Sequence, residues 1–344
     1  MKKQLAAGGL IFALGCTAHA DSSVTLYGVM DSYIGYNQAG GKGTSIGLNG
    51  GGLMANRFGL LGHEDLGGGY RANFTIENGF FVESGALADQ TRLFNRQAWV
   101  GFSGKPGEVR FGRQNSPQFY ILGKLDSFAG ATYGSGLNNM SGYTPRFDNV
   151  IDYRTPSFGG FSGELVFASG NQPGSVVSGS SYIGAADYQK GPLYLGVTHV
   201  ETRSTGPTGS VKTTFAGGSY DIAKARIYVG YFRGNTFNAS SSRNGNYVSL
   251  YGVSGYYSPT TFDRISLGYT FADVSGDVSA SAHEVSLMWA HDISKRTELY
   301  GIATKIWNRG ASAFYLKGAA PVPVNMPAAG HDVVGLQAGV RFLF

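Results

Sequence analysis

The sequence predicts an all-β fold, a closed barrel of 16 antiparallel strands that crosses a membrane. Three observations predict it. The chain begins with a segment typical of exported proteins, apolar residues occupy every second position of many segments, and turn sequences alternate between short and long. Together they indicate strands with one face toward lipid and the other toward water.

The first 20 residues have the features of a cleaved signal peptide. Lys2 and Lys3 precede an apolar run over residues 5–14, which is too short to span a bilayer as a helix. Ala18 and Ala20 place small residues three and one positions before the expected cleavage site. Cleavage after Ala20 is therefore predicted.

Cysteine chemistry is excluded from the mature chain. Cys16 is the single cysteine of the sequence and precedes the expected cleavage site. Lipidation of Cys16 is an alternative, but Ala13 stands where lipoproteins usually carry leucine. Residues 21–344 are expected to form one barrel domain without disulfides or thiolate catalysis.

The composition suits a membrane barrel better than a soluble protein. Aromatic residues make up 13% of the chain, and charged residues make up only 14%, against roughly 25% in soluble domains. No stretch after Ala20 approaches the roughly 18 apolar residues of a membrane helix. Without Lys2 and Lys3, 25 of the 27 basic residues remain against 22 acidic ones, and this small surplus argues against nucleic-acid binding.

Period-two alternation marks strands long enough to cross a membrane. From Val334 to Phe344, apolar residues occupy every second position, and most positions between them are small or polar. The pattern recurs over residues 265–272 and 300–306. The first strand is expected over residues 24–36, and Phe344 on the apolar phase is the expected assembly signal at the end of the last strand.

Turn-forming residues punctuate the chain in two alternating sizes. Short turns are expected at residues 65–69, 104–107, 156–160, 189–192, 221–225, 258–263 and 291–296. Longer loops are expected at residues 37–52, 83–91, 115–147, 170–181, 201–210, 234–246, 273–281 and 308–330. Seven short and eight long connections join 16 strands, an even number that brings the first strand beside the last, with the short turns on the periplasmic side.

A soluble β-sandwich or solenoid is the alternative fold, because such proteins also have short strands at regular spacing. A soluble sandwich requires neither an export signal nor strict alternation of turn length. The barrel is therefore favoured.

Several short segments occur in a specific order, although each is weak alone: SVTLYGVMD at 23–31, NRFGL at 56–60, EDLGGG at 64–69, FNRQAWVG at 94–101, FGRQ at 111–114 and RFDNVIDY at 146–153. In this order they resemble the general porins of Gram-negative bacteria, of the Neisseria and Burkholderia kind. His63 and Asn56 depart from the usual family pattern without affecting the fold expected.

The resemblance implies an outer-membrane homotrimer of 16-stranded barrels, each with its third external loop, residues 115–147, folded into the lumen. It implies a water-filled diffusion channel for ions and small hydrophilic solutes, surrounded by lipid and lipopolysaccharide. Such a channel selects by geometry and by charge at its narrowest point, because charges in water are screened beyond about 8 Å.

Position within the family motifs points to Arg57, Arg96 and Arg146 as the basic side of this constriction. The strand phase supports Arg57, since Phe58 would face lipid and leave Arg57 inward. The phase of Arg96 is less clear, because Gln97 and Trp99 share the opposite phase. An anion preference follows from these three residues.

Two further arginines and two acidic residues complete the predicted site. Arg71 and Arg113 lie on the polar phase of their strands and could extend the basic side. Glu77 and Asp126 are the candidate acidic residues across the lumen, although any of these charges could simply be solvated on the wall.

A substrate-specific channel for a sugar or small anion is the alternative function, and an outer-membrane barrel hydrolase is a minor one. Aromatic residues are expected to form interface girdles more often than sugar platforms. They include Tyr27, Trp99, Tyr256, Tyr257, Trp289 and Trp307. His283-Glu284 lacks the second histidine of a zinc motif, and no metal or cofactor site is predicted. The protein is not expected to be an enzyme.

Overall fold

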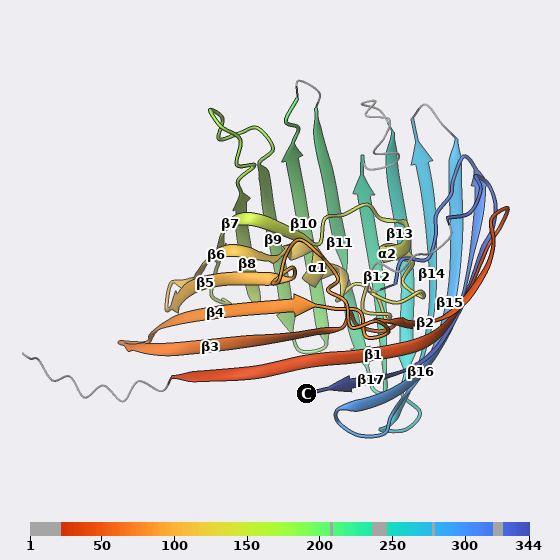
Figure 1. The fold of residues 1–344 in the computed structure, drawn as a ribbon, viewed down its shortest axis with the longest axis horizontal. Helices are drawn as coiled ribbons and strands as arrows, with labels where there is room; N and C mark the ends of the chain where they lie inside the picture. Colours follow the sequence, from red (N-terminus) through yellow and green to blue (C-terminus); the bar gives the residue numbers. More distant parts are fainter. Residues whose placement is uncertain (1–21, 207–208, 236–245, 277–278, 319–325) are drawn as a thin grey trace, which may run out of the picture.

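Alternate side chains of the strands differ in exposure, because one face of the sheet looks outward and the other inward (Figure 1). The computed structural model describes residues 22–206, 209–235, 246–276, 279–318 and 326–344. Near the end of the chain, Leu336 and Phe342 are more than two-fifths exposed, whereas Gln337 between them is buried. The predicted alternation of residues 334–344 is therefore present in the structure.

Seventeen strands and two short helices make up the regular structure of the described residues. The strands are β1 (Ser23–Ala39), β2 (Gly43–Gly50), β3 (Arg57–Gly67), β4 (Tyr70–Gly79), β5 (Gln97–Gly104), β6 (Gly107–Asn115), β7 (Arg146–Arg154), β8 (Phe161–Ala168), β9 (Ser181–Lys190), β10 (Leu193–Arg203), β11 (Ser210–Ile222), β12 (Ala225–Gly234), β13 (Tyr247–Tyr257), β14 (Asp263–Ser275), β15 (Ala280–Asp292), β16 (Thr297–Gly310) and β17 (Val333–Leu343). The helices are α1 (Pro117–Leu122) and α2 (Gly136–Met140).

The sheet closes into a ring of 16 antiparallel strands. Consecutive strands from β3 to β17 pair with one another, and β17 pairs with β1. Strand β3 pairs with the first half of β1, and β2 pairs with its second half. Together β2 and β3 are therefore two parts of one barrel strand. The predicted number of strands and the pairing of first with last are confirmed, and every strand of the ring has a neighbour on each side.

The seven short turns lie where the sequence predicts them. In the turn between β3 and β4, Gly67, Gly68 and Gly69 all have positive φ, a conformation that other residues adopt at a cost. The N–H of Gly67 donates to Asp65 Oδ1 over 2.8 Å and holds the turn. The EDLGGG sequence therefore has a direct conformational reason.

The predicted long loop at residues 37–52 is wrong. Strand β1 continues to Ala39, a tight turn follows, and β2 begins at Gly43. The glycines and asparagine of this stretch suggested a loop, yet Ile46 and Leu48 alternate on the exposed face and complete the strand.

The second barrel strand is interrupted at residues 51–56, which we call the inner segment. The carboxylate of Asp31 on β1 accepts hydrogen bonds from the backbone N–H groups of Gly52, Leu53 and Met54, over 3.1, 2.7 and 2.8 Å. The hydroxyl of Tyr300 donates to the same carboxylate over 2.6 Å. Asp31 thus provides hydrogen-bond acceptors for N–H groups of the inner segment.

Loop 3, residues 116–145 between β6 and β7, packs against the inner side of the wall (Figure 1). Helix α1 contacts β9–β11, and α2 contacts β12–β14. Glycines of the wall make room for the loop: a Cβ at Gly230 would lie 2.4 Å from Leu137 Cδ1. Leu137, Leu125 and Phe128 are buried in this contact.

Some predictions fall outside the described residues. The signal peptide with Cys16 and the cleavage after Ala20 do so, as do parts of the loops expected at 201–210, 234–246, 273–281 and 308–330. Within the described residues, no helix is both long and apolar enough to cross a membrane.

Candidate functional site

One large cavity lies between the barrel wall, the inner segment and loop 3, with a volume of about 1010 Å³. Its lining is strongly basic. Among the described residues, seven basic side chains and one carboxylate line it: Arg57, Arg96, Lys124, Arg146, Arg264, Lys317, Arg341 and Glu77. An ion that crosses this space meets a surplus of positive charge.

Arg57, Glu77 and Arg96 form a group that we call the first triad. Arg57 Nε lies 3.3 Å from Glu77 Oε2, and Arg96 Nε donates to Glu77 Oε1 over 2.7 Å. The hydroxyl of Tyr27 also donates to Glu77, over 2.9 Å. One nearly buried carboxylate thus holds two guanidinium groups close together, and the group keeps a net positive charge.

Local backbone structure brings Arg96 to Glu77. Arg96 is the residue before β5, and its backbone N–H donates to Glu77 O over 3.2 Å. Gly79, on β4 beside this position, has no side chain, and a Cβ there would lie 3.0 Å from Arg96 Cδ. The side chain of Asn95 accepts from the Gly79 N–H over 2.7 Å. Because Arg96 precedes the strand, the strand phase does not determine its direction.

Arg146 lies at the start of β7, where loop 3 ends, and lines the same cavity. Its guanidinium carbon is 5.5 Å from the centre of the Phe119 ring. Its Nε is buried and has no hydrogen-bond partner among the described residues. Because a guanidinium stays charged in proteins, Arg146 adds a positive charge to the cavity.

A family model described as Gram-negative porin matches residues 6–311 of the chain. The chain belongs to this family. Outer membrane porin protein 32 of Delftia acidovorans is 32% identical to the porin, and the match covers 100% of both chains. A solved structure of an anion-selective porin from Comamonas acidovorans has a TM-score of 0.80 and 26% identity, and the match covers 94% of this chain and 100% of that one. A trimer form of OmpT from Vibrio cholerae, at 15% identity, has a TM-score of 0.68, and the match covers 94% of this chain and 99% of that one.

These findings confirm the predicted family, the 16-stranded barrel and the outer-membrane location. The porin is a channel-forming protein of the outer membrane. The roles of the individual predicted site residues stay predictions, although the structure shows where each one lies.

The porin places Glu77 and Asp126 elsewhere than expected. Glu77 does not face the arginines from across the lumen, because it lies on β4 between Arg57 and Arg96 and pairs with both. Asp126 is buried on the side of loop 3 that faces β13–β15, where its carboxylate accepts from the Ser135 hydroxyl over 2.5 Å and from the Phe128 N–H over 2.9 Å. The sequence showed that loop 3 carries an acid, but not which way it points.

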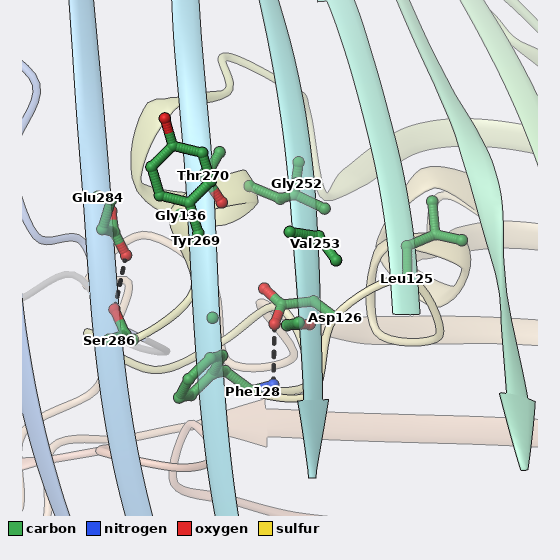
Figure 2. Close-up of a pocket in the computed structure, with 14 residues that line it drawn as sticks. Leu125, Asp126, Phe128, Gly136, Gly252, Val253, Tyr269, Thr270, Glu284 and Ser286 are labelled. Atoms are coloured by element: carbon green, nitrogen blue, oxygen red, sulfur yellow. Dashed lines mark hydrogen bonds between the residues drawn. The ribbon is translucent and has the colours of Figure 1, made fainter. Parts of the chain in front are cut away.

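Asp126 and Glu284 line one small pocket between loop 3 and β13–β15 (Figure 2). Burial raises the pKa of Asp126 to about 6. On β15, Glu284 accepts from Asn139 Nδ2 over 3.2 and 3.1 Å at its two oxygens. Glu284 therefore holds loop 3 to the wall, whereas Asp126 bonds within the loop, and neither acid lines the large cavity.

Arg71 and Arg113 also lie outside the cavity lining. Arg71 is exposed, beside the short turn that precedes β4. Arg113 Nη1 lies 2.5 Å from Asp148 Oδ1, and its Nε donates to Asn95 O over 2.7 Å. Their predicted share in the basic side of the constriction has no support from this placement.

Sequence reasoning missed four basic residues of the cavity lining and the inner segment. Lys124 and Lys317 belong to connections, whereas Arg264 and Arg341 lie on inward phases of β14 and β17. The alternation that predicts the strands could have identified the two arginines. The inner segment left no comparable signal.

Among the aromatic residues, Tyr257 and Trp289 are exposed on the outer face, and Tyr27 lines the cavity. Interface girdles stay a prediction for the others. Within the part of the chain that the structure describes, no cluster of histidine, cysteine and acidic side chains could hold a metal ion.

Proposed function

We propose that this porin is a passive channel with a preference for anions. The preference arises at a constriction formed by Arg57, Arg96 and Arg146. The observation that carries the proposal is the lining of the cavity, with seven basic side chains and one carboxylate. Cations are repelled from such a space, and anions are concentrated in it. The similar fold of the anion-selective Comamonas porin supports the same sign of selectivity.

Bilayer recordings under a gradient of potassium chloride test this proposal. We expect a reversal potential of anion-selective sign, and we expect it to shrink in Arg146→Gln, which removes a charge without leaving a carboxylate unpaired. Arg71→Gln is the matched control, because Arg71 is exposed outside the cavity. A cation-selective wild type, or an equal effect of both variants, contradicts the proposal.

A substrate-specific channel is the second candidate. Apolar and aromatic side chains line the cavity together with the arginines, among them Met54, Phe119, Tyr120 and Tyr143. Such a surface would favour an organic anion with an apolar part. Liposome swelling over a graded series of sugars and carboxylates separates the candidates: a smooth fall of rate with solute size supports a general pore, and a single outlier supports a binding site.

We further propose that residues 21–344 form the mature domain after cleavage of a signal peptide, that the porin is a homotrimer embedded among lipid and lipopolysaccharide, and that it catalyses no reaction. The porin relatives and the trimer form of the Vibrio structure support the assembly. Light scattering of the protein in detergent tests it. A monomer mass contradicts the trimer, and turnover of an ester or peptide in detergent contradicts a purely passive role.

A further inference from the structure

A second group of two arginines and one glutamate repeats the construction of the first triad. Arg264 Nη2 donates to Glu298 Oε1 over 2.9 Å, and Arg341 Nη2 lies 2.5 Å from Glu298 Oε2. The Glu298 side chain is only 3% exposed. We call Arg264, Glu298 and Arg341 the second triad.

The strand register explains how three strands contribute to this group. Glu298 lies directly opposite Arg341 in the pairing of β16 with β17. Arg264 lies on β14, two strands from β16, and its cross-strand partner on β15 is Ala290. Because Ala290 is small, the side chain of Arg264 can reach over β15 to Glu298.

The second triad lies toward the periplasmic end of the same cavity. Arg264 and Glu298 are each the second residue of a strand that follows a short turn, and Arg341 is the third residue from the end of β17. Arg57 of the first triad begins β3, whose far end leads into a short turn. Short turns face the periplasm in such barrels. Both triads contribute arginines to the cavity lining, and the sulfur of Met54, which also lines the cavity, is 3.4 Å from Arg341 Nη1.

The second triad presents positive charge to the cavity. The side chains of Arg264 and Arg341 are 36% and 21% exposed, and both line the cavity. Glu298 orients both guanidinium groups but balances the charge of only one. The contrast with Arg154 is informative, because that arginine pairs with two carboxylates, Asp152 and Glu164, which together outweigh its positive charge.

We infer that Arg264, Glu298 and Arg341 form a second anion-binding site, in series with the first triad and on its periplasmic side. This inference rests on the proposed anion preference. The site takes small inorganic anions and carboxylates, because two guanidinium groups offer paired donors to oxygen anions. An anion that leaves one triad is received by the other, and weak binding at two successive sites favours rapid passage.

Block of chloride current by sulfate tests the second site. The variant Arg264→Gln/Glu298→Gln/Arg341→Gln removes the net charge without leaving a buried carboxylate unpaired. We expect the apparent affinity for sulfate added on one side of the bilayer to fall about thirtyfold, the effect of one positive charge on the two negative charges of sulfate at contact distance in water. Sulfate added on the other side should block as in the wild type.

Glu298→Gln is the companion variant, because it frees both arginines and should strengthen the same one-sided block. Opposite changes in the two variants cannot arise from general damage to the barrel, and Arg71→Gln should change neither side. Unchanged block from both sides in the triple variant, or weaker block in Glu298→Gln, overturns the inference. If the wild type prefers anions and responds to Arg146→Gln in either case, the proposed function stands without the second site.

Discussion

The ring of Phe344 fills the space beside the α-carbon of Gly28, where a Cβ would lie 2.2 Å from Phe344 Cζ. The two residues also exchange backbone hydrogen bonds: the Gly28 N–H donates over 2.9 Å and the Phe344 N–H over 3.1 Å. They continue the pairing of β1 with β17, so the first and last strands of the barrel meet at this contact.

We expect Gly28→Val to destabilise the closed barrel, because the new side chain and the ring of Phe344 cannot occupy the same space. Overpacking of this kind costs about 1–3 kcal/mol. Thermal unfolding in detergent measures the loss, and Gly28→Val/Phe344→Ala should recover part of it. A single variant as stable as the wild type would show that the ring moves aside without cost.

Glu77→Gln should increase the anion preference. The substitution removes the carboxylate that lies between Arg57 and Arg96 and leaves both guanidinium groups charged. The reversal potential in a potassium chloride gradient should therefore change in the opposite direction from that of Arg146→Gln. The two variants remove charges of opposite sign. Shifts of the reversal potential in the same direction would therefore contradict a role of Glu77 and Arg146 in selectivity.

Lys317 should make the anion preference depend on pH. Burial lowers the pKa of Lys317 to about 8, and its ammonium group donates to Ser141 O and lies 5.9 Å from the Tyr315 ring. The charge is present below pH 8 and is lost as the pH rises through 8, whereas arginines stay charged. We expect the reversal potential to shrink between pH 7 and pH 9, and Lys317→Gln to remove this change.

The same shift has a consequence for folding. Since the pKa of Lys317 is lower in the folded chain than in the unfolded one, the unfolded state binds more protons above pH 8. The contribution of Lys317 to stability should therefore rise with pH from about 8 to the unfolded pKa of about 10.4. Unfolding midpoints of the wild type and Lys317→Gln over this range measure it, and parallel curves would contradict it.

Asn139→Ala should loosen loop 3. The Asn139 amide donates to both oxygens of Glu284 and, over 2.7 Å, to Tyr133 O, while its Oδ1 accepts from the Lys317 N–H over 2.9 Å. Without these bonds we expect a larger single-channel conductance and a noisier open channel. Gln90→Ala, at an exposed position, is the control. A quiet channel of unchanged conductance in Asn139→Ala would show that apolar packing alone positions the loop.

Most of the barrel could be predicted from the sequence, because the period of two is a local property of each strand. The exception is β2, where Gly43, Gly47 and Gly50 suggested a loop, and only pairing with β1 makes the segment a strand. Tertiary pairing overrides weak local preference there.

The site could be predicted only in part. Arg57, Arg96 and Arg146 were found by resemblance, and the structure brings them to one cavity. The partners of Glu77 and the burial of Asp126 could not be predicted, because they depend on the path of loop 3 and on which strands are neighbours. Arg264 and Glu298 meet across β15 only because of the barrel register, which no local pattern encodes.

The interruption of the second barrel strand bears on how the position of Arg57 is fixed. Asp31 and Tyr300 fix the inner segment to the barrel wall, and Arg57 follows directly after this segment at the start of β3. The position of Arg57 is thus set by the barrel wall and not by the loops at the cell surface. Changes of sequence in those loops should therefore leave the position of Arg57 unchanged.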